Sequence, residues 1–189
     1  MTLLTVKDLE KKYPKITQKE LKDFKDSIDN PETNKRYDIF LIHPNLHLKL
    51  LYRINKELES LGFSIYLDCC VIQDSDFSTE KEKGLHRIKK IMKNCRCLFL
   101  VVLNEKSQSF LCPWKVGYFD CLKGKVAILP VFKKDTNTLV FKGRKFLSIY
   151  PYAGFGEIAF EARDTIWLLK DPKNYVDIEY WLGRSFIDF

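Results

Sequence analysis

The feature that most constrains this chain is an alternation of short apolar runs with segments of helical periodicity. The runs are rich in β-branched and aromatic residues and too short for buried helices. They are Tyr37–His43, Phe63–Asp68, Cys97–Leu103 and Val126–Phe132. Strands of a parallel sheet are buried on both faces and are therefore apolar throughout rather than alternating. The order predicts an α/β fold with a doubly wound parallel sheet.

Helices are expected between these strands. The first has apolar residues at helical spacing from Leu48 to Leu61 and a stop at Gly62. The second begins at a cap, Ser78 or Thr79, and its apolar face is Leu85, Ile88, Ile91, Met92 and Cys95. The third spans Cys112–Lys123 before Gly124. Its stripe of Trp114, Gly117, Tyr118 and Cys121 is predicted to pack on the sheet, with Gly117 allowing close approach.

Composition narrows the classes of protein. A chain of 189 residues, 46% of them hydrophobic, suits one well-buried domain. The net charge of +7 comes from lysines and arginines interleaved with acids, which argues against a nucleic-acid interface. The sequence shows neither an apolar run long enough for a membrane span nor a signal peptide, so a cytoplasmic protein is expected.

The six cysteines are expected to be buried free thiols. Cys69-Cys70 and Cys95-Arg96-Cys97 lack the spacing of a zinc knuckle, and the histidines supply no matching pair. No metal is therefore expected.

The segment Cys112–Lys123, CPWKVGYFDCLK, resembles the catalytic segment of bacterial Toll/interleukin-1 receptor (TIR) domains. That segment commonly reads Ser-x-Trp-Met-Pro-Trp-Glu-Leu-Gly-Tyr-Phe-Asp-Gly before a buried strand. Other stretches follow the family's order. YDIFLIH resembles its first strand, GFSIYLD its second, IKKIMKNCRCLFLVVL its second helix and third strand, and FKGRKFLSIYPY a tail of this subgroup.

The resemblance implies a TIR-like, flavodoxin-like domain over residues 37–152. Residues 1–36, with loosely spaced apolar residues, are expected to form a helical N-terminal extension. Residues 153–189 are expected to be a C-terminal extension packed on the same domain, in which Asn174–Leu182 closes the chain as a helix.

In an open parallel sheet, ligands bind beyond the carboxyl ends of the strands. The expected ligand-binding residues are Ile42, His43, His47, Asp68, Trp114 and Lys115. Several alternatives are open from the residues alone. His43 is either a ligand contact or a structural histidine, and Asp68 is either an acid of the pocket or the cap of a loop. Lys115 is either solvent-exposed or paired with a phosphate of a nucleotide.

The sequence departs from the family pattern near the expected pocket. Ile42 stands where serine is usual, His47 where aspartate commonly follows, Cys69 where the subgroup often has tryptophan, and Lys115 at the catalytic glutamate. Cleaving nicotinamide from ribose develops positive charge on the sugar, which a carboxylate stabilises and a lysine opposes. Charges about 4 Å apart at an effective dielectric near 20 interact by roughly 4 kcal/mol, so the reversal changes the barrier by up to about 8 kcal/mol. Half of that is about three powers of ten in rate.

No catalytic residue is therefore assigned, and three hypotheses follow from the resemblance. The first is a TIR-like protein of bacterial immune, anti-phage signalling that binds NAD or an ADP-ribose-like nucleotide, or assembles with other TIR domains or a partner effector, and whose NAD cleavage is lost or weakened. The second is an active NAD hydrolase or cyclase using another acid, Asp68 or Glu157. Asp120 points about 140° away from Lys115 on the helix and is not expected to substitute. The third is an adaptor without a ligand. No cofactor is required in any of them; NAD is a ligand or a substrate.

Overall fold

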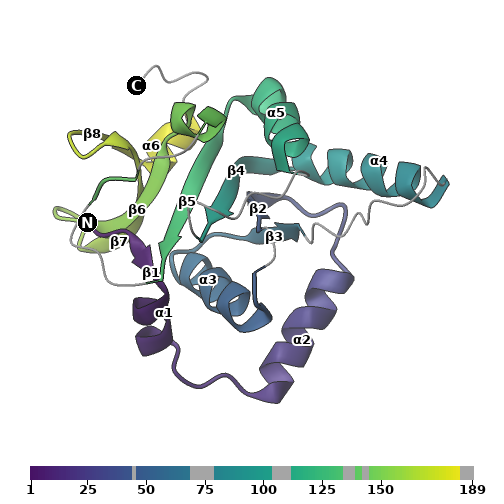
Figure 1. Ribbon diagram of the computed structural model, residues 1–189, viewed down its shortest axis with the longest axis horizontal. Coiled ribbons are helices and arrows are strands. Elements are labelled where there is room, and N and C mark those ends of the chain that lie inside the picture. Colours follow the sequence, from purple (N-terminus) through teal and green to yellow (C-terminus); the bar gives the residue numbers. More distant parts are fainter. Residues whose placement is uncertain (44–45, 69–78, 104–111, 134–138, 142–144, 184–189) are drawn as a thin grey trace.

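A central, mostly parallel sheet organises the computed structural model, which describes residues 1–43, 46–68, 79–103, 112–133, 139–141 and 145–183 (Figure 1). The strand order is β3-β2-β4-β5-β6-β7-β8. The strands of the parallel part are β2 (Tyr37–Ile42), β3 (Ile65–Asp68), β4 (Cys95–Val102), β5 (Val126–Phe132) and β6 (Tyr152–Ile158). The antiparallel strands β7 (Arg163–Asp171) and β8 (Asn174–Asp177) continue the sheet beyond β6. The predicted α/β fold with a doubly wound parallel sheet is confirmed.

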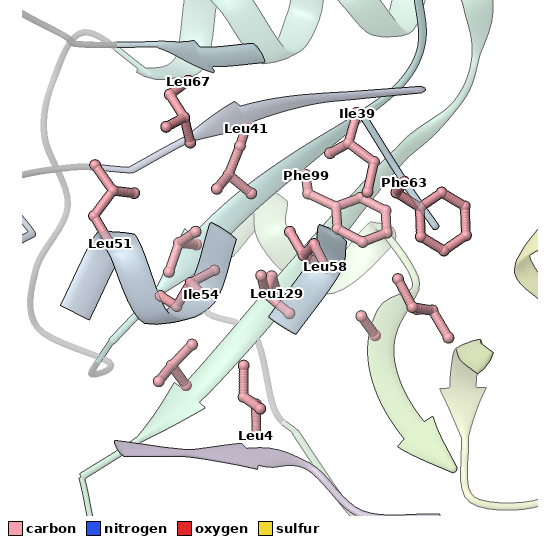
Figure 2. Packing of buried hydrophobic residues seen from close by; sticks show 14 of the residues in the cluster. Leu4, Ile39, Leu41, Leu51, Ile54, Leu58, Phe63, Leu67, Phe99 and Leu129 are labelled. Carbon is pink, nitrogen blue, oxygen red and sulfur yellow. The ribbon is translucent and has the colours of Figure 1, made fainter. Parts of the chain in front are cut away.

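Helices cover both faces of the sheet. One face packs against α1 (Val6–Lys12), α2 (Gln18–Asp29), α3 (Leu48–Ser60) and α6 (Ile178–Gly183). Figure 2 shows this cluster, in which Leu51, Ile54 and Leu58 of α3 meet side chains from the sheet. The opposite face packs against α4 (Thr79–Lys93), α5 (Cys112–Lys123) and the short 3₁₀ helix η1 (Lys145–Ile149). Two apolar layers with the sheet between them are what near-continuous apolar strands require.

The N-terminal region is helical, as expected, but it also contributes a strand. Thr17 caps α2 through a capping box, in which its hydroxyl accepts from the Glu20 N–H and the Glu20 carboxylate accepts from the Thr17 N–H. The short strand β1 (Leu4–Thr5), which the sequence did not indicate, pairs in parallel with β5. The proposed division at residues 36 and 152 stays a prediction, although β6, β7 and β8 belong to the same sheet as β2 to β5.

The boundaries predicted for some helices and strands are wrong. Asn174–Leu182 is not one helix, because β8 pairs with β7 before α6 begins. Cys95 is the first residue of β4 rather than part of the face of α4. The expected cap Ser78 lies outside the described residues. Cys95 and Cys97 are buried free thiols as expected, whereas Cys121 is exposed.

The face of α5 that meets the sheet also differs from the prediction. Val116 and Phe119 are buried, while Gly117 and Cys121 of the expected stripe are exposed. A side chain added at Gly117 would meet no atom within 4 Å, so this glycine is not a point of close approach. Lys115 also lies on this buried face, where sequence patterns place apolar residues, so the apolar stripe indicated the wrong face. Within the described ranges, no helix is both long and apolar enough to cross a bilayer.

Candidate functional site

The strands β2 and β3 end level with each other at one edge of the sheet, and β4 continues two residues further. Ile42, the last residue of β2, pairs in register with Asp68, the last residue of β3, and with Leu100 on β4. His43 follows Ile42 directly. Because parallel strands end at the same edge, these residues meet at the place where open α/β sheets bind ligands.

Lys115 and Asp68 form an ion pair at this edge. The Lys115 Nζ donates to Asp68 Oδ2 over 2.5 Å, and the two side chains are 1% and 2% exposed. The same Nζ lies 5.8 Å from the centre of the Trp114 ring. A buried ion pair is compensated only by close geometry, because each charge loses its hydration. Lys115 is therefore not solvent-exposed. Pairing of Lys115 with a phosphate stays a prediction, and Asp68 belongs to this ion pair whether or not it also caps a loop.

His43 is buried beside this pair and is unusual in its hydrogen bonding. The residue is 8% exposed, and neither ring nitrogen has a hydrogen-bond partner among the described residues. The pKa of His43 is lowered to about 4, chiefly by burial; the charge of Asp68 raises it, and that of Lys115 lowers it. The imidazole is therefore neutral at pH 7, with one nitrogen able to donate and the other able to accept. An unsatisfied buried polar group costs about 1–3 kcal/mol, so both nitrogens favour a polar partner.

Comparisons with known proteins show which family the chain belongs to. No model of a known protein family matches the chain. A curated protein of Bacillus cereus (strain MSX-D12), named "Probable 3' cyclic ADP-D-ribose synthase ThsB'", is 33% identical over 156 residues. The match covers 82% of this chain and 80% of that protein. The chain belongs to the TIR-like family of this synthase. The expected resemblance to TIR domains is thereby confirmed at the level of the family.

Within this TIR-like chain, the structure brings His43, Asp68, Trp114 and Lys115 together. Ile42 is fully buried in the apolar cluster beneath α4 and α5. His47 is exposed just before α3, and its side chain makes no capping hydrogen bond. Contact of Ile42 and His47 with a ligand stays a prediction, and Cys69 lies outside the described residues.

The other acids considered from the sequence lie away from Lys115. Asp120 accepts a hydrogen bond from the Tyr150 hydroxyl over 3.1 Å. Glu157 is exposed on β6, four places along the sheet from β3. Asp68 is thus the carboxylate that the described residues place at Lys115. Among those residues, no three His, Cys, Asp or Glu side chains gather closely enough to hold a metal ion.

The pairing of Lys115 with Asp68 is what sequence reasoning missed. The two residues are 47 positions apart in the sequence, and no local pattern connects them. A signal was present, because an acid that ends a buried strand and a lysine in an apolar helix both require an opposite charge.

Proposed function

We propose that this TIR-like protein binds NAD or an ADP-ribose-like nucleotide at the carboxyl edge of its sheet, and that its cleavage of NAD is lost or weakened. The buried ion pair between Lys115 and Asp68 carries the proposal. It would act in bacterial immune, anti-phage signalling, by binding the nucleotide or by assembling with other TIR domains or a partner effector.

The ion pair removes the electrostatic help that cleavage needs. Positive charge that develops on ribose is stabilised by a carboxylate with no counter-charge of its own. The negative charge of Asp68 is already compensated by Lys115 over 2.5 Å. The charges of Asp68 and Lys115 cancel, so the pair gives a cationic transition state no net electrostatic stabilisation. The ammonium group also stands at the position of the family's glutamate.

The same edge suits a polar, uncharged part of a nucleotide. His43 offers one donor and one acceptor at a buried position, and Trp114 offers a half-buried ring beside Lys115. Ribose hydroxyls and carboxamides both donate and accept, and aromatic rings stack on bases. These features support binding of a nucleotide without requiring that it be cleaved.

The test measures NAD consumption at high protein concentration by wild type, Lys115→Glu, and Lys115→Glu with Asp68→Asn. The double variant is needed because the single change places a second carboxylate beside Asp68, where like charges repel. We expect turnover to rise by about three powers of ten in the double variant. This corresponds to about half of the roughly 8 kcal/mol by which reversing the charge changes the barrier. Lys90→Glu, an exposed lysine on α4, is the control. Robust NAD turnover by wild type would refute the proposal.

Binding is measured separately by titrating NAD and ADP-ribose into wild type in a calorimeter. Heat from wild type but not from His43→Phe would support nucleotide binding at this edge. The same heat from both proteins would place the nucleotide elsewhere. Light scattering on the same samples reports homo-oligomers, and an adaptor without a ligand would show an assembly but no heat.

A second candidate is an active NAD hydrolase or cyclase that uses Asp68. The name of the Bacillus cereus relative, a probable synthase of 3' cyclic ADP-D-ribose, favours it, as does the carboxylate of Asp68 at the strand end. In that case wild type consumes NAD and Asp68→Asn does not, whereas Glu157→Gln keeps full activity. If Asp68→Asn also keeps full activity, this candidate is removed.

A further inference from the structure

A groove outside the site described above lies along the open edge of the sheet. We propose that it binds an extended, basic peptide segment of a partner protein, which pairs with β3 as an added strand. The proposal does not rest on NAD chemistry. The groove has a volume of about 540 Å³, and its walls come from α2, α3, the segment that joins α2 to β2, and β3. α3 packs against both α2 and β3 (Figure 1).

The groove follows the edge of β3 rather than one of its faces. Ile65, Tyr66 and Leu67 all line it. Successive side chains of a strand point to opposite faces of a sheet. Three consecutive residues can border one groove only where it runs beside the strand. β3 ends the sheet order and pairs with β2 alone, so this edge lies beside the groove.

The hydrogen-bond register shows which backbone groups face the groove. The Ile39 N–H donates to the Ser64 carbonyl over 3.0 Å, and Ile39 pairs with Ile65. In a parallel ladder this sets the backbone groups of residues 64, 66 and 68 toward β2. Those of Ile65 and Leu67 point outward, and no described residue outside β3 bonds to them. Outward N–H and C=O groups of an edge strand are the template on which an extended peptide pairs.

The charges of the groove select the kind of peptide. The groove is lined by the carboxylates of Glu20, Asp23, Glu32 and Glu59 and by the ammonium groups of Lys35 and Lys56. The net charge of these side chains is −2, whereas that of the whole chain is +7. Asp23 and Glu32 make no ion pair with any described residue. Lys35 and Lys56 lie over the rings of Tyr37 and Tyr52. Two carboxylates without an ion-pair partner and a negative charge sum favour a segment with lysine or arginine.

The test uses fluorescence anisotropy with a labelled, capped hexapeptide of alternating lysine and valine, and a matched peptide of alternating glutamate and valine. We expect the basic peptide to bind and to weaken as salt rises, and the acidic peptide not to bind. Asp23→Lys with Glu32→Lys should weaken binding by about tenfold or more. Asp26→Lys, an exposed residue of α2 that does not line the groove, should leave binding unchanged.

A second variant tests the strand pairing itself. Ile65→Pro removes an outward N–H and leaves the bonds to β2 in place, because proline is tolerated on edge strands. It should abolish binding of the basic peptide while the circular dichroism spectrum stays that of wild type. If Ile65→Pro does not fold, the charge variants decide alone.

Several results would overturn the proposal. The first is that the basic peptide does not bind. The second is that the acidic peptide binds as tightly as the basic one, and the third is that Asp26→Lys weakens binding as much as Asp23→Lys with Glu32→Lys. A dimer seen by light scattering and lost with the charge variants would mean that a second copy of this chain occupies the edge. NAD consumption is measured on the same variants, so failure of this proposal is distinct from failure of the proposed function.

Discussion

Removing one partner of the buried ion pair should destabilise the protein far more than removing both. The singles are Lys115→Met and Asp68→Leu, and the double combines them. Both side chains are almost fully buried, and their charged atoms are 2.5 Å apart. The matched control is the exposed pair Lys56–Glu59, at 2.9 Å with side chains 43% and 45% exposed.

The magnitude follows from two opposing terms. At 2.5 Å and an effective dielectric of about 20, the attraction between Lys115 and Asp68 is about 6–7 kcal/mol. Removing the charges from water costs several kcal/mol for each ion, so the pair as a whole contributes little net stability. A single substitution takes the opposite charge away from a buried ion and should cost about 3–5 kcal/mol. Such a loss is a large part of the free energy of unfolding of a typical domain, which is roughly 5–15 kcal/mol.

The assay is urea unfolding followed by tryptophan fluorescence and circular dichroism. Both singles should lower the free energy of unfolding by the predicted amount. In the double variant, the free energy of unfolding should fall by much less than the sum of the two single losses, because apolar side chains replace both ions. Lys56→Met should change it by less than about 1 kcal/mol. If Lys115→Met costs no more than Lys56→Met, the pair is not desolvated and the argument about the site fails.

Three further predictions concern stability. Stability should fall by about 3 kcal/mol between pH 6.5 and pH 4, because burial lowers the pKa of His43 to about 4 and the unfolded chain takes up a proton first. His43→Gln should flatten that part of the pH profile of the urea midpoint, and an unchanged slope would contradict the assignment. Gly117→Ala should raise the thermal midpoint by the equivalent of about 0.5–1 kcal/mol, because the site is open and helical. A lower midpoint would show a contact there. Thr17→Ala removes the capping box of α2 and should cost about 1 kcal/mol in urea unfolding, whereas Thr17→Asn should cost much less.

The parts of the fold that were predicted closely are those whose local signals agree with their tertiary setting. β5 and α5 have the limits expected from the sequence, Val126–Phe132 and Cys112–Lys123. Gly124 follows α5 with a φ of 60°, and Gly62 follows α3 with a φ of 89°. Glycine adopts this left-handed conformation without strain, so it is a dependable sign of a helix end.

The parts that were missed depend on contacts distant in sequence. β1 is too short, at two residues, to show a strand pattern, and β8 contains Asn174 and Asp177, which are rare in strands. β1 exists because β5 offers it a pairing edge, and β8 because β7 does. Strand propensity depends strongly on such context. An isolated segment therefore contains little information about whether it will join the edge of a sheet.

The orientation of α5 shows the same limit at the site itself. From sequence alone, the helical spacing of the stripe that contains Trp114 and Tyr118 predicts that this face of the helix packs on the sheet. Both are half-buried in the structure, and the charged Lys115 is buried instead. A lysine is stable there because Asp68, from the end of β3, lies within 2.5 Å. The register of β2 with β3 fixes the position of that acid, so the partner of Lys115 follows from the sheet rather than from the helix. The substitution at the family's glutamate position and the acid that compensates it should therefore be varied together, because changing Lys115 alone leaves Asp68 in a site built for an ion pair.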